Sequence, residues 1–306
     1  MMRKAFQFGS AAALMLMLEA CGGAGGGIAS LPPPTPTPTP PPAPTPQGAW
    51  YDTSKSTDFT SVATDVEDKV GVDNNVTSTI SPDGADDVQI AYSAEQGSYV
   101  VTLPGVGQGH LSGNELLDSS GNSLAFVSLG AKESGFTYVD IGEWGVGDKP
   151  DARLGVFAFG TPTAAGDVPL SGTGNYSGRI AAQTDEAYVR EPSGDLFPMV
   201  VSGTVTLSFD FAAGTLSGEI APILSCENCF ESYLPNMPFT QTVYSAGSTS
   251  YSGKFDTPLA GPNGFNGVFA GPHAAETMAQ FQAPYIDPYY WTDLHVRSGV
   301  WIAKQP

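Results

Sequence analysis

Strict two-residue alternation of apolar and polar side chains is the feature that most limits what this chain can fold into. It is clearest in residues 203–220, GTVTLSFDFAAGTLSGEI. Successive side chains of a strand point to opposite faces, so this pattern predicts strands with one buried face and one wet face. Similar short runs, separated by Gly, Asn, Asp and Pro, recur along the chain, and helical periodicity is nearly absent. The predicted fold class is all-β.

The first half of the body predicts two hairpins and a further strand. Residues 88–103 read as strand, turn and strand, with the turn at 94–97. Residues 122–145 repeat this plan with a turn at 132–135, and residues 153–160 add another strand. We therefore expect a small N-terminal β domain over residues 49–165.

The second half predicts a barrel over residues 166–306. Its apolar face in residues 203–220 is formed by Val205, Leu207, Phe209 and Phe211, and Gly214 follows in a turn, where glycine takes positive φ at little cost. Residues 249–255 and 264–271 predict a further pair of strands, and residues 299–305 a last one. A final strand in this position is expected to pair with the first strand of the region, which closes a barrel and removes open edges.

The first 20 residues predict an export signal. Arg3 and Lys4 precede an apolar run at 11–18 that is too short to span a bilayer as a helix. The following LEAC resembles a bacterial lipobox, which implies cleavage before Cys21 and acylation of that residue, including a palmitate-type chain. The alternative is an ordinary signal peptide with an incidental cysteine.

Residues 21–48 predict a tether. A glycine-rich stretch leads into LPPPTPTPTPPPAPTPQG, which cannot build a packed core and favours polyproline II. At about 3.1 Å per residue, fifteen such residues reach roughly 45 Å. We expect the tether to hold the folded body away from a membrane, to which the lipid on Cys21 attaches it.

The charge balance excludes one class of partner. The chain has 31 acidic and 12 basic residues and a formal net charge of −19. A body of this charge is repelled by nucleic acid and by anionic lipid headgroups. We expect no nucleic-acid partner.

Two cysteines remain besides Cys21, and they lie close together in the stretch CENC. In an exported protein, Cys226 and Cys229 are expected to form a small local disulfide. A redox site needs a helix N-terminus to lower a thiol pKa, whereas these flanks read as loop. A zinc site needs four ligands, and the chain has no second cysteine pair.

The sequence offers no catalytic or metal constellation. His273 and Glu276 supply two ligands at most, and no Gly-x-Ser-x-Gly elbow accompanies any of the 3 histidines. Residues 81–87 gather three carboxylates without the spacing of a calcium loop, and a solvated acidic turn is the default interpretation there, with weak calcium binding as the alternative. The chain is predicted to be no enzyme and to need no cofactor or metal.

Four segments carry a resemblance to a known family. In order they are residues 157–180, 201–220, 251–255 and 264–281, and together they resemble the C-terminal barrel of the transferrin-binding protein B-like surface lipoproteins. The most specific part is the pattern Gly-x-Phe-x-Gly-Pro-x-Ala-x-Glu, formed here by Gly267, Phe269, Gly271, Pro272, Ala274 and Glu276. The N-terminal hairpins resemble the small handle domain of that family more weakly.

The resemblance implies an eight-stranded antiparallel barrel beside a small β handle domain, carried on a lipid at the bacterial outer membrane. It also implies that Gly-Pro ends one strand at a corner, where Glu276 satisfies backbone N–H groups or a nearby arginine. Family members bind extracellular ligands such as iron-carrier proteins, haem proteins and host regulators. This chain departs from the family at residues 282–298, where a long stretch stands in place of a tight turn.

Two aromatic-rich stretches are the candidate binding surfaces. They are residues 223–239, which contain the cysteine pair, and residues 282–298. Aromatic side chains dominate contact energies at interfaces, and a disulfide reduces the entropy lost on binding. The alternative is that these aromatics plug the barrel or pack on the handle. The candidate ligand-binding residues are Phe230, Tyr233, Tyr285, Tyr289, Tyr290 and Trp291.

The sequence therefore predicts a non-enzymatic, lipid-anchored binding protein at the bacterial outer membrane, displayed on the cell surface. Its expected ligand is an extracellular protein or a carrier of iron or haem. The alternative is a structural or assembly lipoprotein of the envelope with no soluble ligand.

Overall fold

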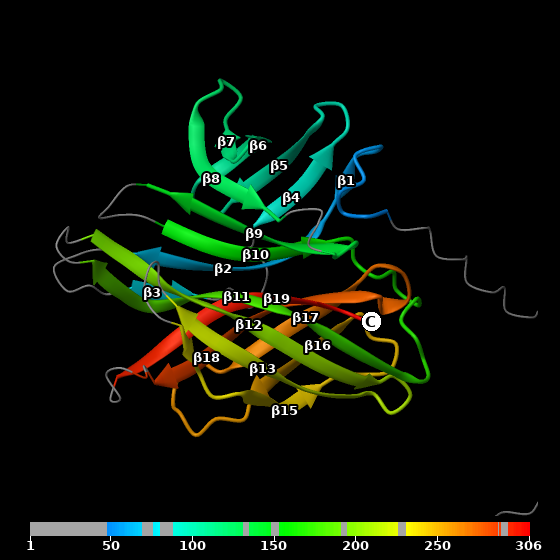
Figure 1. Cartoon of the computed structure of the whole chain (residues 1–306). Helices are drawn as coiled ribbons and strands as arrows, with labels where there is room; N and C mark the ends of the chain where they lie inside the picture. Colours follow the sequence, from blue (N-terminus) through cyan, green and yellow to red (C-terminus); the bar gives the residue numbers. More distant parts are fainter. Residues whose placement is uncertain are drawn as a thin grey trace, which may run out of the picture. The chain divides into compact units, whose positions relative to one another are not determined.

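A computed structural model describes residues 48–68, 76–79, 88–130, 135–147, 153–190, 195–225, 231–286, 288 and 293–306. The expected signal peptide, Cys21, nearly all of the tether and the pair Cys226 and Cys229 lie outside these residues. The described part of the chain is built almost entirely of antiparallel strands (Figure 1). The predicted all-β class is confirmed.

Ten strands form the N-terminal sheet. They are β1 (Thr57–Asp58), β2 (Thr60–Asp68), β3 (Val76–Thr79), β4 (Gln89–Ser93), β5 (Ser98–Leu103), β6 (Gly107–Ser112), β7 (Glu115–Leu117), β8 (Ser123–Leu129), β9 (Val139–Val146) and β10 (Arg153–Gly160). Strands β4 to β10 follow one another as a meander. The predicted hairpins are present as β4–β5 and β8–β9.

The first two strands curl this sheet back on itself. β1 pairs with β4 at one edge of the meander, and β2 pairs with β10 at the other. Only Phe59 separates β1 from β2, and its backbone N–H donates to the carbonyl of Ile90 at 3.1 Å. One continuous segment therefore joins both edges, which gives the sheet a barrel-like form.

Nine strands form the C-terminal sheet. They are β11 (Thr173–Arg190), β12 (Asp195–Asp210), β13 (Thr215–Ser225), β14 (Ser232–Tyr233), β15 (Met237–Val243), β16 (Ser250–Phe255), β17 (Gly264–Ala270), β18 (Glu276–Ile286) and β19 (Leu294–Lys304). All of them except β14 close into one ring, because β12 pairs with both β11 and β13 while β19 pairs with both β11 and β18. The predicted eight-stranded barrel, closed by the last strand on the first, is confirmed.

The barrel core follows the alternation seen in the sequence. Val205, Leu207 and Phe209 are buried, whereas Thr206 between them is exposed. The ring of Phe209 meets that of Phe269 edge to face with centroids 4.8 Å apart, so opposite walls of the barrel touch directly. Gly214 has a φ of 66°, as the turn requires.

The expected long stretch at 282–298 proves to be mostly strand. β18 continues to Ile286 and β19 starts at Leu294, with Tyr285 paired to His295. The apolar alternation is interrupted here by Pro284 and by polar residues, which made the sequence read as loop. Pairing of β18 with β19 extends the ladder past this interruption, from Pro284 with Val296 to Ile286 with Leu294.

The two sheets share one buried layer. Val139, Ile141 and Val156 of the N-terminal sheet pack with Met278 and Ile302 of the barrel in a single cluster. Met278 and Ile302 point outward from β18 and β19, whereas the inward residues of these two strands fill the barrel. Both faces of the last two strands are thus buried, so burial along them is nearly continuous even where the residues are polar.

Removal of residues 299–306 is expected to abolish cooperative unfolding of the barrel, because the lost residues pair with both β11 and β18. Trp301→Ala keeps the strand but removes a side chain that is fully buried and stacked on Phe281 with centroids 5.6 Å apart. Trp301→Ala should lower the free energy of unfolding, measured by chemical denaturation, by about 3–5 kcal/mol. Deletion of the exposed Pro306 alone is the control. An unchanged thermal transition in the long truncation contradicts the closed barrel.

Candidate functional site

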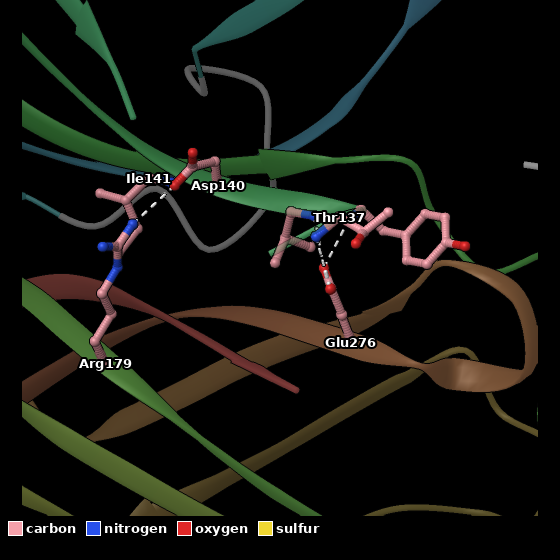
Figure 2. A network of polar contacts seen from close by, with 7 residues as sticks. Thr137, Asp140, Ile141, Arg179 and Glu276 are labelled. Carbon is pink, nitrogen blue, oxygen red and sulfur yellow. Dashed lines mark hydrogen bonds and ion pairs between the residues drawn. The ribbon is translucent and has the colours of Figure 1, made fainter. Parts of the chain in front are cut away.

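The Gly-Pro corner between β17 and β18 is a structural joint. Gly271 has a φ of 73°, and a Cβ there would lie 2.3 Å from the ring of Tyr138. The corner then delivers Glu276 to the first position of β18. Figure 2 shows this side chain pointing from the barrel toward the start of β9.

Glu276 holds the N-terminal sheet through three backbone N–H groups. Its Oε1 accepts from Thr137 N at 2.8 Å, and its Oε2 accepts from Tyr138 N at 2.8 Å and Val139 N at 2.9 Å. The residue is 4% exposed. Burial raises the pKa of its carboxyl, while the three N–H bonds and Lys304 act in the opposite direction. The expectation that Glu276 satisfies backbone N–H groups is confirmed.

Two cationic side chains of the barrel, Arg179 and Lys304, bind the same segment next to the contacts of Glu276. Arg179 Nη2 lies 2.8 Å from Oδ1 of the fully buried Asp140, as Figure 2 shows. Lys304 Nζ donates to Gly135 O at 2.6 Å and lies 5.3 Å from the ring centroid of Phe136. Residues 135–141 are therefore fixed from three barrel strands, β11, β18 and β19.

His273 is also used locally. Its backbone N–H donates to Asp167 Oδ2 at 2.9 Å, and its Nδ1 lies 2.8 Å from Asp167 Oδ1. The residue has a φ of 54°, so the paired carboxylate helps hold a left-handed backbone in the corner. His273 and Glu276 thus face different partners and form no joint site.

Glu276→Gln is expected to destabilise the protein by about 2–4 kcal/mol, because an amide nitrogen replaces an acceptor that faces backbone N–H groups. Hydrogen exchange of the amides of residues 137–139 should speed up in the same variant. Glu143→Gln, at an exposed position of β9, is the matched control. Equal stability of both variants in chemical denaturation contradicts this role of Glu276.

One end of the barrel gathers the two aromatic stretches that the sequence singles out. Strand register pairs Ser225 of β13 with Val200 of β12, Thr184 of β11 with Arg297 of β19, and Ile286 of β18 with Leu294 of β19. The connections after β11, β13 and β18 therefore leave the barrel at one end, which we call the loop end. The meeting of β18 and β19 is visible at the left of Figure 1.

Exposed apolar side chains concentrate at the loop end. Seven large apolar residues are exposed in the described part of the chain, and four of them are placed here by their strands: Val200, Tyr233, Ile286 and Leu294. Tyr233 on β14 is 80% exposed. A local excess of exposed apolar groups is typical of interaction sites.

The structure places the sequence-predicted residues differently from one another. Tyr233 is exposed at the loop end, whereas Tyr285 is buried in the barrel core. Phe230, Tyr289, Tyr290 and Trp291 lie outside the described residues, as does the cysteine pair. A binding role for all of these residues stays a prediction.

Arg297 is the residue of this end that sequence reasoning missed. It points into the barrel, is 1% exposed, and lies between Thr184 and Ala283 in the strand register. Burial lowers the pKa of its guanidinium to about 10. A signal was present, because the alternation of β19 places Arg297 on the same face as the buried Trp301.

Neighbouring polar groups at this end are paired with one another. His295 Nδ1 lies 3.2 Å from Asp185 Oδ1, which also accepts from the backbone N–H of Val296 at 2.9 Å. The ring of His295 lies 5.6 Å from that of Tyr285. Asp185 thus ties β11 to β19 just beyond Arg297.

A hollow of about 510 Å³ lies on the outer wall formed by β15 to β18. It contains one cation, Lys254, and side-chain amides supply most of its polar groups. Gln241, at an irregularity in the β15–β16 pairing, has a φ of 47°. The amide-bearing lining residues are Gln241, Asn263, Asn266, Gln280 and Gln282. This wall offers neutral hydrogen-bonding groups and no acid–base pair.

The described residues contain neither a metal-ligand cluster nor a membrane-spanning helix. No group of three or more His, Cys, Asp or Glu side chains there is arranged to hold a metal ion. No helix among those residues is long and apolar enough to cross a membrane.

Comparison with known proteins gives matches to solved structures. A scan of protein-family models finds no match, and a search of curated proteins finds none either. A variant of transferrin-binding protein B from Haemophilus parasuis matches with 17% identity and a TM-score of 0.42, over 80% of this chain and 44% of that one. The same protein from Neisseria meningitidis matches with 13% identity and a TM-score of 0.39, over 80% and 43%.

A structure described as a surface lipoprotein matches with 15% identity and a TM-score of 0.42, over 80% of this chain and 99% of that chain. This chain spans less than half the length of the transferrin-binding protein B chains. The family named from the sequence is therefore also the one found among solved structures. At TM-scores of 0.39 to 0.42 these matches carry no conclusion about ligand or location.

Proposed function

We propose that this chain is a lipid-anchored binding protein of the bacterial outer membrane, displayed at the cell surface. Its loop end takes an extracellular protein, of which an iron or haem carrier is the class that the sequence resemblance favours. Cys21 carries the lipid, residues 21–48 form the tether, and the N-terminal sheet supports the barrel as a handle.

The placement of exposed apolar side chains is the observation that carries this proposal. Val200, Tyr233, Ile286 and Leu294 come from four different strands, and the register of the barrel brings all four to one end. In the sequence, the predicted aromatic residues Tyr289, Tyr290 and Trp291 stand between Ile286 and Leu294, outside the described residues. An interface with buried aromatic anchors uses such an arrangement.

Binding without catalysis is the mode that the described side chains favour. His273 and Glu276 are the side chains weighed above as catalytic or metal-binding residues, and both make structural contacts. Glu276 accepts hydrogen bonds from three backbone N–H groups, and His273 pairs with Asp167. The hollow on the outer wall adds side-chain amides and the cation Lys254.

Tyr233→Ala combined with Leu294→Ser should lower ligand capture by tenfold or more, about 1.4 kcal/mol, and leave the melting temperature unchanged. Tyr290→Ala with Trp291→Ala should act in the same direction. The control is Leu170→Ser, because Leu170 is 71% exposed but lies outside the loop end, beside Gly247. The measurement is capture from the natural medium by the full chain, with melting temperatures recorded alongside. Equal capture by all variants favours the alternative of an envelope lipoprotein with no soluble ligand.

Cys21→Ala is expected to release the protein from membranes or to leave its signal peptide uncleaved, because the acylated cysteine supplies the anchor. Fractionation, mass measurement of the N-terminus and fatty-acid labelling test this in cells. Normal processing and membrane association of Cys21→Ala, with no lipid label on the wild type, contradict the anchor.

A further inference from the structure

The guanidinium of Arg297 is poorly satisfied for a buried cation. Within the described residues its Nε and Nη1 have no hydrogen-bond partner, and its Nη2 donates to the sulfur of Met237. A thioether is a weak acceptor. The ring of Tyr285, with its centroid 5.6 Å from Cζ, is the other favourable contact. A buried charge without a counter-charge is costly, so its presence calls for a reason.

Two other large polar side chains of the same core, Tyr251 and Tyr176, are satisfied. Tyr251 Oη bonds to Thr277 Oγ1 at 2.8 Å and accepts from Trp301 Nε1 at 3.3 Å. Tyr176 Oη donates to Ala274 O at 2.5 Å. Among the described residues, Tyr244 Oη is an unpaired neutral group of this core, whereas Arg297 leaves two nitrogens of a cation unpaired.

The wall beside Arg297 is the weakest seam of the barrel. β13 pairs with β15 only at Glu219 with Pro238 and at Ile220 with Met237. Proline has no N–H to donate to a ladder. The short β14 adds its pairing at Ile223 and Leu224, and Leu234 N donates to Pro222 O at 3.0 Å.

The segment along this seam contacts the arginine through Met237. Residues 232–237 contribute Met237 and Leu234 to the core cluster and carry the exposed Tyr233 on the other side. A ligand that engages Tyr233 therefore acts on the segment that carries Met237, the hydrogen-bond partner of Arg297. Met237 is unbranched and adapts readily to a new neighbour.

We infer that Arg297 is the anchoring cation for a carboxylate of the ligand, which displaces the Met237 sulfur when residues 232–237 move aside at the loop end. The planar guanidinium matches a carboxylate and forms two parallel hydrogen bonds with it. The inference rests on the proposed binding function and names the chemistry that the ligand must bring to this end.

Carboxylate-dependent stability of the full chain tests the inference without knowledge of the ligand. Succinate is the probe, compared with chloride and with phosphate at equal ionic strength. The variants are Arg297→Met, which keeps the volume and removes the charge, and Arg297→Lys, which keeps the charge and removes the planar fork. Lys254→Met is the control, because Lys254 is an exposed cation on the outer wall.

The wild type and Lys254→Met should melt several degrees higher in succinate than in chloride, because a ligand that binds only the folded state stabilises it. Phosphate should give a smaller shift. Arg297→Met should melt no lower than the wild type in chloride and lose the succinate shift, and Arg297→Lys should retain only part of it. An equal succinate shift in Arg297→Met, or no shift in the wild type, overturns the inference.

Failure of the inference is distinguishable from failure of the proposed function. Ligand capture that depends on Tyr233 and Leu294 but is unchanged in Arg297→Met supports the binding function and rejects the arginine as its anchor. The reverse result is also informative. If the rise in melting temperature with succinate requires Arg297, but ligand capture is unchanged in the Tyr233 and Leu294 variant, the carboxylate site is retained and the proposed macromolecular ligand at the loop end is rejected.

Discussion

The carboxylate of Glu276 is the contact on which the arrangement of the two sheets depends. It leaves the first position of β18 and accepts three consecutive backbone N–H groups, those of Thr137, Tyr138 and Val139. These N–H groups lie at the very start of β9, where the ladder has not yet begun to satisfy them. A single side chain thus replaces sheet pairing at the entrance of a strand and fixes that strand against the barrel.

This contact succeeds because the barrel around it is rigid. β19 closes the ring between β11 and β18, so Arg179, Glu276 and Lys304 come from three adjacent strands. All three contact the same stretch, residues 135–141. The shared apolar layer of Val139, Met278 and Ile302 lies beside these polar contacts. The same three strands, β11, β18 and β19, therefore both close the barrel and attach the N-terminal sheet to it.

The two ends of the barrel have different physical characters. Away from the loop end, the core is a network of aromatic rings around Phe209 and Phe269, in which Tyr251 Oη is paired with Thr277 Oγ1. At the loop end the core contains the poorly satisfied Arg297, beside the seam where β13 and β15 are joined by only two residue pairs. Stability is concentrated in the first region, which leaves the second free to change on binding.

The sequence by itself determined the strands and the closed barrel, and its family resemblance indicated a structural use of Glu276 whose partners only the structure identified. Alternation of period two shows locally which face is buried, and the Gly-Pro corner reveals where a strand must end. Only the tertiary structure decided that β18 and β19 continue past Pro284, that Tyr285 is buried while Tyr233 is exposed, and that the exposed apolar residues share one end. These features depend on strand register and on ring closure, which bring together residues far apart in the chain. No local pattern contains that information.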